Sequence, residues 1–363
     1  MQRFDLGRRK FVTFTLAAGA AAVAARAGQR PIPFIRTSAK SGLENPILGS
    51  GEHRYECIHD WLTPPDGLVW GDTHGLAQDS AGRIYVAHTV HPSSTKPFAV
   101  VVFDDRGKFL SAWGEAFRGG AHGLDVREEH SFSPSGEFLY HCDINRHLVV
   151  KTDLSGKEVW TAEWPKESCK YEAKEKYTPT NVAFLPDSGD DAPGDILVGD
   201  GYGSSYIHRY TAEGKYVKTI IGPGADKGQV SCPHGLWIDP RSGKPRLAVA
   251  DRANRRIQYF SLDGEHAGFV TDGIRMPCHF KTRGEIMLVP DLESVVTLLD
   301  KDNKVIVHLG DGHPSNLRGQ PRDKFIPGKF IHPHSAIFLK NGDILVAEWV
   351  PIGRITLLRR IGS

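Results

Sequence analysis

The stretch Val249-Ala-Asp-Arg-Ala-Asn-Arg-Arg-Ile-Gln-Tyr-Phe260 combines a short apolar strand that ends in an acid, a polar turn and a second apolar strand. It follows His234-Gly235-Leu236, and the same order of His-Gly-Leu or an equivalent, a turn and an apolar strand occurs six times. The copies start 48, 59, 53, 45 and 55 residues apart, at His74, His122, Asn181, His234, His279 and His334. A repeat period of this length is typical of a β-propeller.

Each copy predicts one four-stranded antiparallel blade, because its apolar runs, such as residues 196–200, are too short for helices. We therefore expect an all-β fold in which six blades close into a propeller spanning residues 51–363. The sixth copy stops after its third strand, at residues 354–361. The N-terminal segment 55–61 is expected to supply the missing fourth strand of this last blade and so to close the ring. Residues 28–50 are expected to form an extended leader.

The first 27 residues have the pattern of an export signal. Gly7-Arg8-Arg9-Lys10 precedes fifteen uncharged residues, 11–25, and the small-x-small triplet Ala25-Arg26-Ala27 completes the segment. The pattern resembles a twin-arginine signal peptide, and its apolar run is shorter than the about 20 residues that cross a bilayer as a helix. We expect a periplasmic or extracellular protein with no stable membrane insertion after cleavage.

Composition and charge exclude several classes of protein. A chain of 363 residues with 40% hydrophobic and 24% charged residues can bury a large core, unlike a disordered chain. The formal net charge of +2 becomes −2 without residues 1–27. General binders of nucleic acid or of anionic membranes are more basic than this. We expect a monomer that acts on a small-molecule substrate and binds no nucleic acid.

The repeat places a ring of imidazoles on the axis, because the first strand of each propeller blade lines the central channel. Alternate blades of six lie about 120° apart, so His122, His234 and His334 form a three-fold set. Three neutral imidazoles with an open position commonly hold catalytic zinc, and nitrogen ligands favour zinc or another divalent d-block ion. The remaining blades offer residues that would orient the ligands or contact the substrate: His74, Asn181 and His279.

Two alternatives stay open on the sequence alone. The axial histidines could instead bridge adjacent blades through backbone hydrogen bonds or waters. His88 replaces the acid that ends the second strand in the other five copies. It could face the metal cavity, or it could be a local substitution for an acid that ties down a turn.

The phrase at 249–260 resembles the NHL repeat, and the resemblance extends in weaker form over all six copies. The run Gly199-Asp-Gly-Tyr-Gly-Ser-Ser-Tyr-Ile207 resembles the Asp-Gly-Tyr-x-x-Ser segment of the peptidyl-α-hydroxyglycine α-amidating lyases. That family consists of six-bladed propellers that hold zinc by three histidines from alternate blades, and the resemblance covers roughly residues 55–361. It implies the same three zinc ligands, Tyr202 as the catalytic base, and Arg252 near the same site.

The chain departs from that family at two positions. The resemblance implies a structural Ca²⁺ held by backbone oxygens of Leu76 and Leu124 and by an aspartate after the last zinc ligand, where this chain has the neutral Ser335. The family's substrate-binding arginine falls at Thr89, so the usual partner of a substrate carboxylate is missing.

These residues predict an exported, metal-dependent lyase-like enzyme that acts on a small hydroxylated, carbinolamide-like substrate. The pKa of Tyr202, ordinarily near 10, would be shifted down by the metal and by Arg252. The alternative is a non-catalytic propeller that binds a protein or carbohydrate partner. A sugar lactonase fits less well, because such sites hold calcium with carboxylates and Asn, whereas this ring is imidazole.

Overall fold

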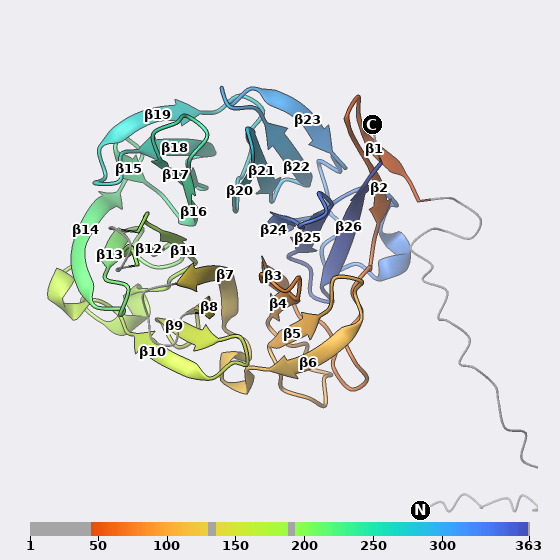
Figure 1. Ribbon diagram of the computed structural model, residues 1–363, viewed down its shortest axis with the longest axis horizontal. Coiled ribbons are helices and arrows are strands. Elements are labelled where there is room, and N and C mark those ends of the chain that lie inside the picture. Colours follow the sequence, from red (N-terminus) through yellow and green to blue (C-terminus); the bar gives the residue numbers. More distant parts are fainter. Residues whose placement is uncertain (1–44, 130–135, 188–192, 362–363) are drawn as a thin grey trace, which may run out of the picture. The chain divides into compact units, whose positions relative to one another are not determined.

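The computed structural model describes residues 45–129, 136–187 and 193–361. Their strands form six sheets, and the sheets surround a common axis as the blades of a propeller (Figure 1). The all-β, six-bladed architecture predicted from the repeat is therefore confirmed. The signal peptide predicted at 1–27 and the leader as far as residue 44 lie outside the described residues.

Each blade begins with the strand nearest the axis and ends with the strand at the rim (Figure 1). The strands of blades one to three are β3 (Thr73–Gln78), β4 (Ile84–His88), β5 (Val100–Phe103), β6 (Phe109–Trp113); β7 (Ala121–Glu129), β8 (Gly136–Asp143), β9 (Leu148–Asp153), β10 (Glu158–Ala162); β11 (Asn181–Phe184), β12 (Ile196–Gly199), β13 (Ile207–Tyr210), β14 (Tyr216–Pro223) and the short β15 (Gln229–Val230). Those of blades four to six are β16 (Pro233–Asp239), β17 (Arg246–Asp251), β18 (Arg256–Phe260), β19 (His266–Val270); β20 (Lys281–Arg283), β21 (Ile286–Asp291), β22 (Val295–Leu299), β23 (Val305–Leu309); β24 (Pro333–Phe338), β25 (Ile344–Glu348) and β26 (Arg354–Arg360). Short 3₁₀ turns lie between them at η1 (Glu115–Phe117), η2 (Lys166–Ser168), η3 (Lys174–Lys176) and η4 (Arg322–Lys324).

The ring closes by pairing the two ends of the propeller. Strand β2 (His53–Ile58) runs antiparallel to β26, with Tyr55 opposite Arg360 and Ile58 opposite Leu357. The predicted closing strand is therefore confirmed. The structure adds a strand that the sequence did not predict, because β1 (Ile47–Ser50) pairs with β2 as a fifth strand of blade six. The end of the expected leader is thus part of the sheet.

The core lies between neighbouring blades. The second strands are mostly buried, and β4 and β25 are buried along their whole length, because adjacent blades cover both of their faces. Strands buried in this way are continuous apolar runs in the sequence. The rim strand β6, in contrast, has only exposed and partly buried residues. None of the described residues forms a helix long and apolar enough to cross a membrane. All five cysteines are described, and each is a free thiol.

A register shift positions the axial histidines. In blade one Thr73 pairs with His88 but Leu76 pairs with Val86, so β3 carries one extra residue around His74. The same one-residue shift surrounds the other four axial histidines: His122, His234, His279 and His334. Blade three, which has Asn181 instead, pairs in regular register. A bulge re-aims the side chain that it contains, so the local slip accounts for the imidazoles turning toward the axis.

Candidate metal centre

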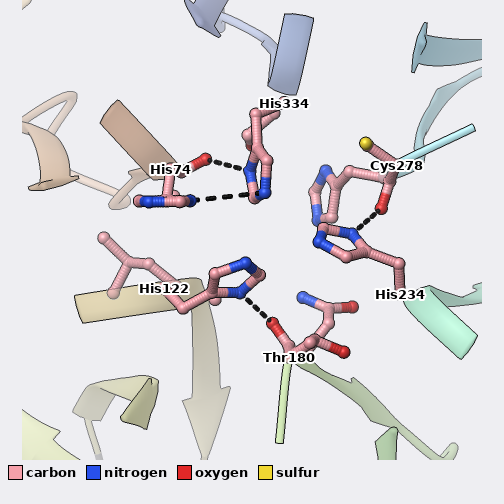
Figure 2. Close-up of a pocket in the computed structure, with 12 residues that line it drawn as sticks. His74, His122, Thr180, His234, Cys278 and His334 are labelled. Atoms are coloured by element: carbon pink, nitrogen blue, oxygen red, sulfur yellow. Dashed lines mark hydrogen bonds between the residues drawn. The ribbon is translucent and has the colours of Figure 1, made fainter. Parts of the chain in front are cut away.

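Four imidazoles meet on the axis (Figure 2). The ring centroids of His122 and His334 are 4.7 Å apart, and that of His234 is 4.9 Å from the first and 4.7 Å from the second. His74 completes the group, at 4.7 Å from His122 and 4.5 Å from His334. The space between them has a volume of about 10 Å³, which is room for one ion or one water.

The three histidines from alternate blades are held in the same way. Nδ1 of His122 lies 2.9 Å from the carbonyl oxygen of Thr180, and Nδ1 of His234 lies 2.9 Å from that of Cys278 (Figure 2). Nδ1 of His334 lies 3.2 Å from the carbonyl oxygen of His74. Because a carbonyl oxygen only accepts, each Nδ1 carries the hydrogen and each Nε2 keeps a free lone pair. This is the tautomer that a metal ligand needs.

The glycine after the histidine allows this anchoring. A Cβ atom on Gly123 would lie 2.3 Å from the carbonyl oxygen of Thr180, and one on Gly235 would lie 2.3 Å from that of Cys278. At these two positions only a residue without a side chain lets the neighbouring blade's carbonyl approach the imidazole; in blade six, Ser335 follows the histidine and the carbonyl oxygen of His74 lies 3.2 Å from Nδ1 of His334. The His-Gly pair of the repeat is thus one structural unit.

The closest group of ligand atoms differs from the expected triad. Nitrogen atoms of His74, His122 and His334 lie within 4.8 Å of one another, whereas His234 is outside this group. Nδ1 of His74 is 3.3 Å from Nε2 of His334. Since Nδ1 of His334 is the donor to a carbonyl, His74 must donate in this contact. His74 therefore directs a hydrogen, and not a lone pair, at the nitrogen of His334.

Burial keeps the cluster neutral. Desolvation lowers the pKa of His122 to about 3, and it holds the pKa values of His74, His234 and His334 well below the ordinary value. Neighbouring imidazoles and Arg252 act in the same direction on His234 and His334. Neutral imidazoles are the form that binds a metal ion.

Tyr202 and Arg252 lie directly at this cluster. The hydroxyl of Tyr202 is 3.3 Å from Nε2 of His122 and 3.1 Å from Nε2 of His234, although the residue as a whole is 40% exposed. Arg252 donates from Nη1 to the same hydroxyl at 3.3 Å, and its guanidinium packs 5.0 Å from the Tyr202 ring centroid. No described carboxylate lies within ion-pair distance of Arg252. A phenol, a guanidinium and two imidazoles, contributed by three blades, therefore converge on one point.

The pKa of Tyr202 is not lowered by the protein alone. Desolvation raises the pKa to about 12, and Arg252 opposes this shift without overcoming it. A phenolate at neutral pH would thus need a further positive charge beside the hydroxyl.

Asn181 and His279 belong to a separate polar group next to the imidazole cluster. Asn181 donates to Asp125 at 3.2 Å and accepts from the backbone nitrogen of Leu236 at 2.9 Å. Nε2 of His279 lies 3.6 Å from Asp125, and Lys281 forms an ion pair with the same carboxylate. Desolvation raises the pKa of Asp125, but Lys281 and His279 outweigh it and lower the pKa. These residues line or flank the axis without contacting the metal-binding nitrogens.

The hypothesis that His88 faces the metal cavity is wrong. Its Nδ1 accepts from the backbone nitrogens of Gly71 and Val90, each at 3.1 Å, and its Nε2 lies 3.1 Å from the carbonyl oxygen of Phe98. Both ring nitrogens of His88 therefore form hydrogen bonds with the backbone of blade one. Asp200 accepts from backbone nitrogens in the same way in blade three. His88 is a local replacement for the turn-fixing acid.

The residues implied for calcium do not offer a calcium site. Leu124 and the neutral Ser335 line the axial cavity, and Leu76 lies on the first strand of blade one. The carboxylate that follows Leu124, Asp125, is already paired with Lys281. Calcium prefers several anionic oxygen ligands. Here the Lys281 ammonium group neutralises the carboxylate of Asp125.

Sequence reasoning missed a second guanidinium near the cluster. Arg318 comes from the loop between β23 and β24, donates to Asp72 at 2.9 Å and lies 3.6 Å over the ring of Trp349. Its charge is one of the causes, after burial and His122, that lower the pKa of His74. The backbone nitrogen of Asp72 donates to the hydroxyl of Thr89 at 3.0 Å, at the position where the family arginine is missing. Arg318 lies in a loop outside the repeat, so no pattern in the sequence could reveal it.

No protein-family model matches the chain. The chain is 27% identical over 242 residues, 59% of its length, to peptidylglycine alpha-amidating monooxygenase of Rattus norvegicus. It is 37% identical over 89 residues, 23% of its length, to the peptidyl-glycine alpha-amidating monooxygenase of Mus musculus. It spans only 23% and 8% of the lengths of these relatives. The likeness to amidating enzymes that the Asp-Gly-Tyr run indicated is confirmed.

Solved structures share the fold. A gluconolactonase of Xanthomonas campestris has a TM-score of 0.56 at 14% identity, over 87% of this chain and 96% of that one. A streptogramin B lyase has a TM-score of 0.54 at 10% identity, over 85% of this chain and 99% of that one. At these identities the similarity establishes the propeller and says nothing about the site.

Proposed function

We propose that this protein is a metal-dependent lyase acting on a small hydroxylated, carbinolamide-like substrate. The observation that carries the proposal is the meeting on the propeller axis of the Tyr202 hydroxyl, the Arg252 guanidinium, which has no described carboxylate partner, and the unprotonated Nε2 atoms of His122 and His234. The likeness to amidating enzymes supports the same reaction type.

The residues present fit a divalent d-block ion such as Zn²⁺. His122, His234 and His334 would hold it, because each has its Nδ1 fixed by a backbone carbonyl and its Nε2 without a hydrogen. When bound, such an ion acts as a Lewis acid that lowers the pKa of a hydroxyl group.

Tyr202 would act as the proton carrier. Its phenolate takes the proton of the substrate hydroxyl, the carbon–nitrogen bond breaks as the carbon–oxygen bond becomes a carbonyl, and the phenol returns the proton to the departing amide nitrogen. One hydroxyl-bearing amide therefore gives one amide and one aldehyde, with no other reactant. The position of the hydroxyl against two imidazoles places it where this proton must move.

Arg252 would bind an anionic group of the substrate. Its guanidinium is free of a described carboxylate partner, and it lies beside the hydroxyl that carries the proton. Arg318 is already neutralised by Asp72, and position 89 holds threonine. The amidating lyases have a substrate-binding arginine at the position of Thr89, so in this chain Arg252 alone is left to bind an anionic group. A single arginine favours a small hydroxylated substrate over a peptide.

A non-catalytic propeller is the second candidate. The contacts from Nδ1 to carbonyls of the neighbouring blade are also what a purely structural role would use. The test is release of the aldehyde product, glyoxylate, from α-hydroxyglycine amides by protein loaded with Zn²⁺, compared with Tyr202→Phe. Glyoxylate release that depends on Tyr202 supports the enzyme, whereas its absence over a panel of acyl groups favours the binding protein.

We also propose that the chain is exported by the twin-arginine route, which carries folded proteins and would allow metal loading before export. The double substitution Arg8→Lys and Arg9→Lys should leave the precursor inside the cell. Unchanged export of this variant would exclude that route.

A further inference from the structure

A second cavity lies along the first strands of the blades, next to the polar group formed by Asp125, Asn181, His279 and Lys281. Its volume is about 530 Å³, within the range of about 300–1,000 Å³ that small-molecule sites occupy. It is lined by residues of the first strands of blades one, two, four, five and six that come after the position of the axial histidine in each blade. The imidazole cluster lies at the beginning of those strands. This cavity is therefore distinct from the candidate metal centre.

An ion pair forms the inner wall of the cavity. Lys281 contacts both the carboxylate of Asp125 and the face of Trp237, with Nζ 4.4 Å from the ring centroid. Asp125 is 2% exposed and is further held by Asn181. The wall is thus fixed, and its carboxylate is already neutralised.

Two further cations line the same cavity without an acidic partner. Arg283 donates from Nη1 to the carbonyl oxygen of Leu339 at 3.0 Å, and Lys340 donates from Nζ to the carbonyl oxygen of Ser80. Neither has a carboxylate within ion-pair distance in the part of the chain that the structure describes. Backbone carbonyls fix both groups in place but leave their charge unbalanced. With Lys281 and Asp125 cancelling, the cavity lining carries two net positive charges.

The remaining lining is apolar and aromatic. Trp237 and Phe338 are partly buried, and Nε1 of Trp237 is fixed by the hydroxyl of Thr282 at 3.2 Å. Ile337 and Leu339 extend this surface. A cavity with fixed aromatic walls and unpaired cations fits a ligand that has an apolar body and one anionic end.

We propose that this cavity is a binding site for a small organic carboxylate, with Arg283 and Lys340 as the anion contacts and Trp237 as the apolar wall. The proposal does not depend on the reaction at the imidazole cluster. A carboxylate is favoured over a larger polyanion because only two unbalanced charges are available.

The test is calorimetric titration of the full chain with hexanoate and with its uncharged counterpart hexanamide, while Trp fluorescence is recorded. Hexanoate should bind with a dissociation constant of about 1 mM or lower, and hexanamide should bind at least about tenfold more weakly. The fluorescence change should disappear in Trp237→Phe.

Variants separate this site from the axial one. Arg283→Gln and Lys340→Gln should each weaken hexanoate binding about tenfold, whereas the exposed Lys108→Gln and the axial Arg252→Gln should not change it. If Arg283→Gln loses its fold by circular dichroism, Lys340→Glu provides the same test. No saturable heat with hexanoate, equal binding of hexanamide, or loss of binding in Arg252→Gln alone would overturn the proposal.

Discussion

The hydroxyl oxygen of Tyr202 lies 3.1 Å from Nε2 of His234, although the two residues belong to different blades. Arg252 donates to the same hydroxyl, and His122 contacts it from a third blade. A phenol in this position can exchange a proton with anything that binds in front of the imidazoles.

Replacing Tyr202 by Phe should abolish turnover while leaving metal binding intact. The loss should be about 10²–10⁴-fold in kcat, the usual contribution of a positioned acid–base group. Glyoxylate release and bound zinc are measured on the same preparation, with Tyr206→Phe as the matched control. Unchanged kcat in Tyr202→Phe would remove the proposed base.

The ligand set is tested by comparing His234→Ala with His74→Ala. We expect His234→Ala to weaken zinc binding by more than the about 10–100-fold that loss of an outer hydrogen-bond partner costs. His74→Ala should cost no more than that, because His74 directs a hydrogen at His334. Competition with a chromophoric chelator measures both affinities. The reverse order would instead identify His74, His122 and His334 as the ligands.

Replacing Gly123 by Ala should disturb one imidazole selectively. The new Cβ would stand 2.3 Å from the carbonyl oxygen of Thr180, which anchors His122. We expect a loss of about 1–3 kcal/mol in the free energy of unfolding, together with weaker zinc binding. Gly136→Ala is the control in urea unfolding, because no atom of the described residues lies within 4 Å of its new Cβ. Equal stability and metal affinity of the two variants would contradict this role of the His-Gly pair.

Acid should destabilise the fold through its buried histidines. Desolvation lowers the pKa values of His88, His141 and His208 to about 3. The unfolded chain, with pKa values near 6.5, binds more protons between these limits, so stability is present above about pH 6.5 and is lost as the pH falls toward 3. Each group contributes up to about 1.4 kcal/mol per pH unit. Urea unfolding at pH 7 and pH 5 measures this, and equal stability at both values would refute it.

The sequence predicted the blades because a propeller repeats one local pattern, and the second strand of each copy can be recognised by its buried apolar run. The closing strand followed from the missing fourth strand of blade six. Strand β1 was not predicted, because it is a fifth strand added to a blade that the repeat pattern already completes with four.

The site was predictable where it depends on the repeat or on the resemblance to the amidating lyases. His122 and His234 occupy repeat positions, the resemblance implied Tyr202 and Arg252, and the structure brings these residues together. The role of Arg318 depends on the path of an irregular loop, and that of Lys281 depends on which side chain crosses the axis to Asp125. His88 was ambiguous because only its contacts, and not its type, reveal that it replaces an acid.

The central claim is that imidazoles from alternate blades hold one catalytic metal ion. Its most direct test is elemental analysis of protein purified from its native source, beside the single variants His122→Ala, His234→Ala and His334→Ala. The native protein should hold about one d-block ion per chain, and each variant should lose it. Native protein that is folded and free of such metals, or variants that keep a full complement, would contradict it.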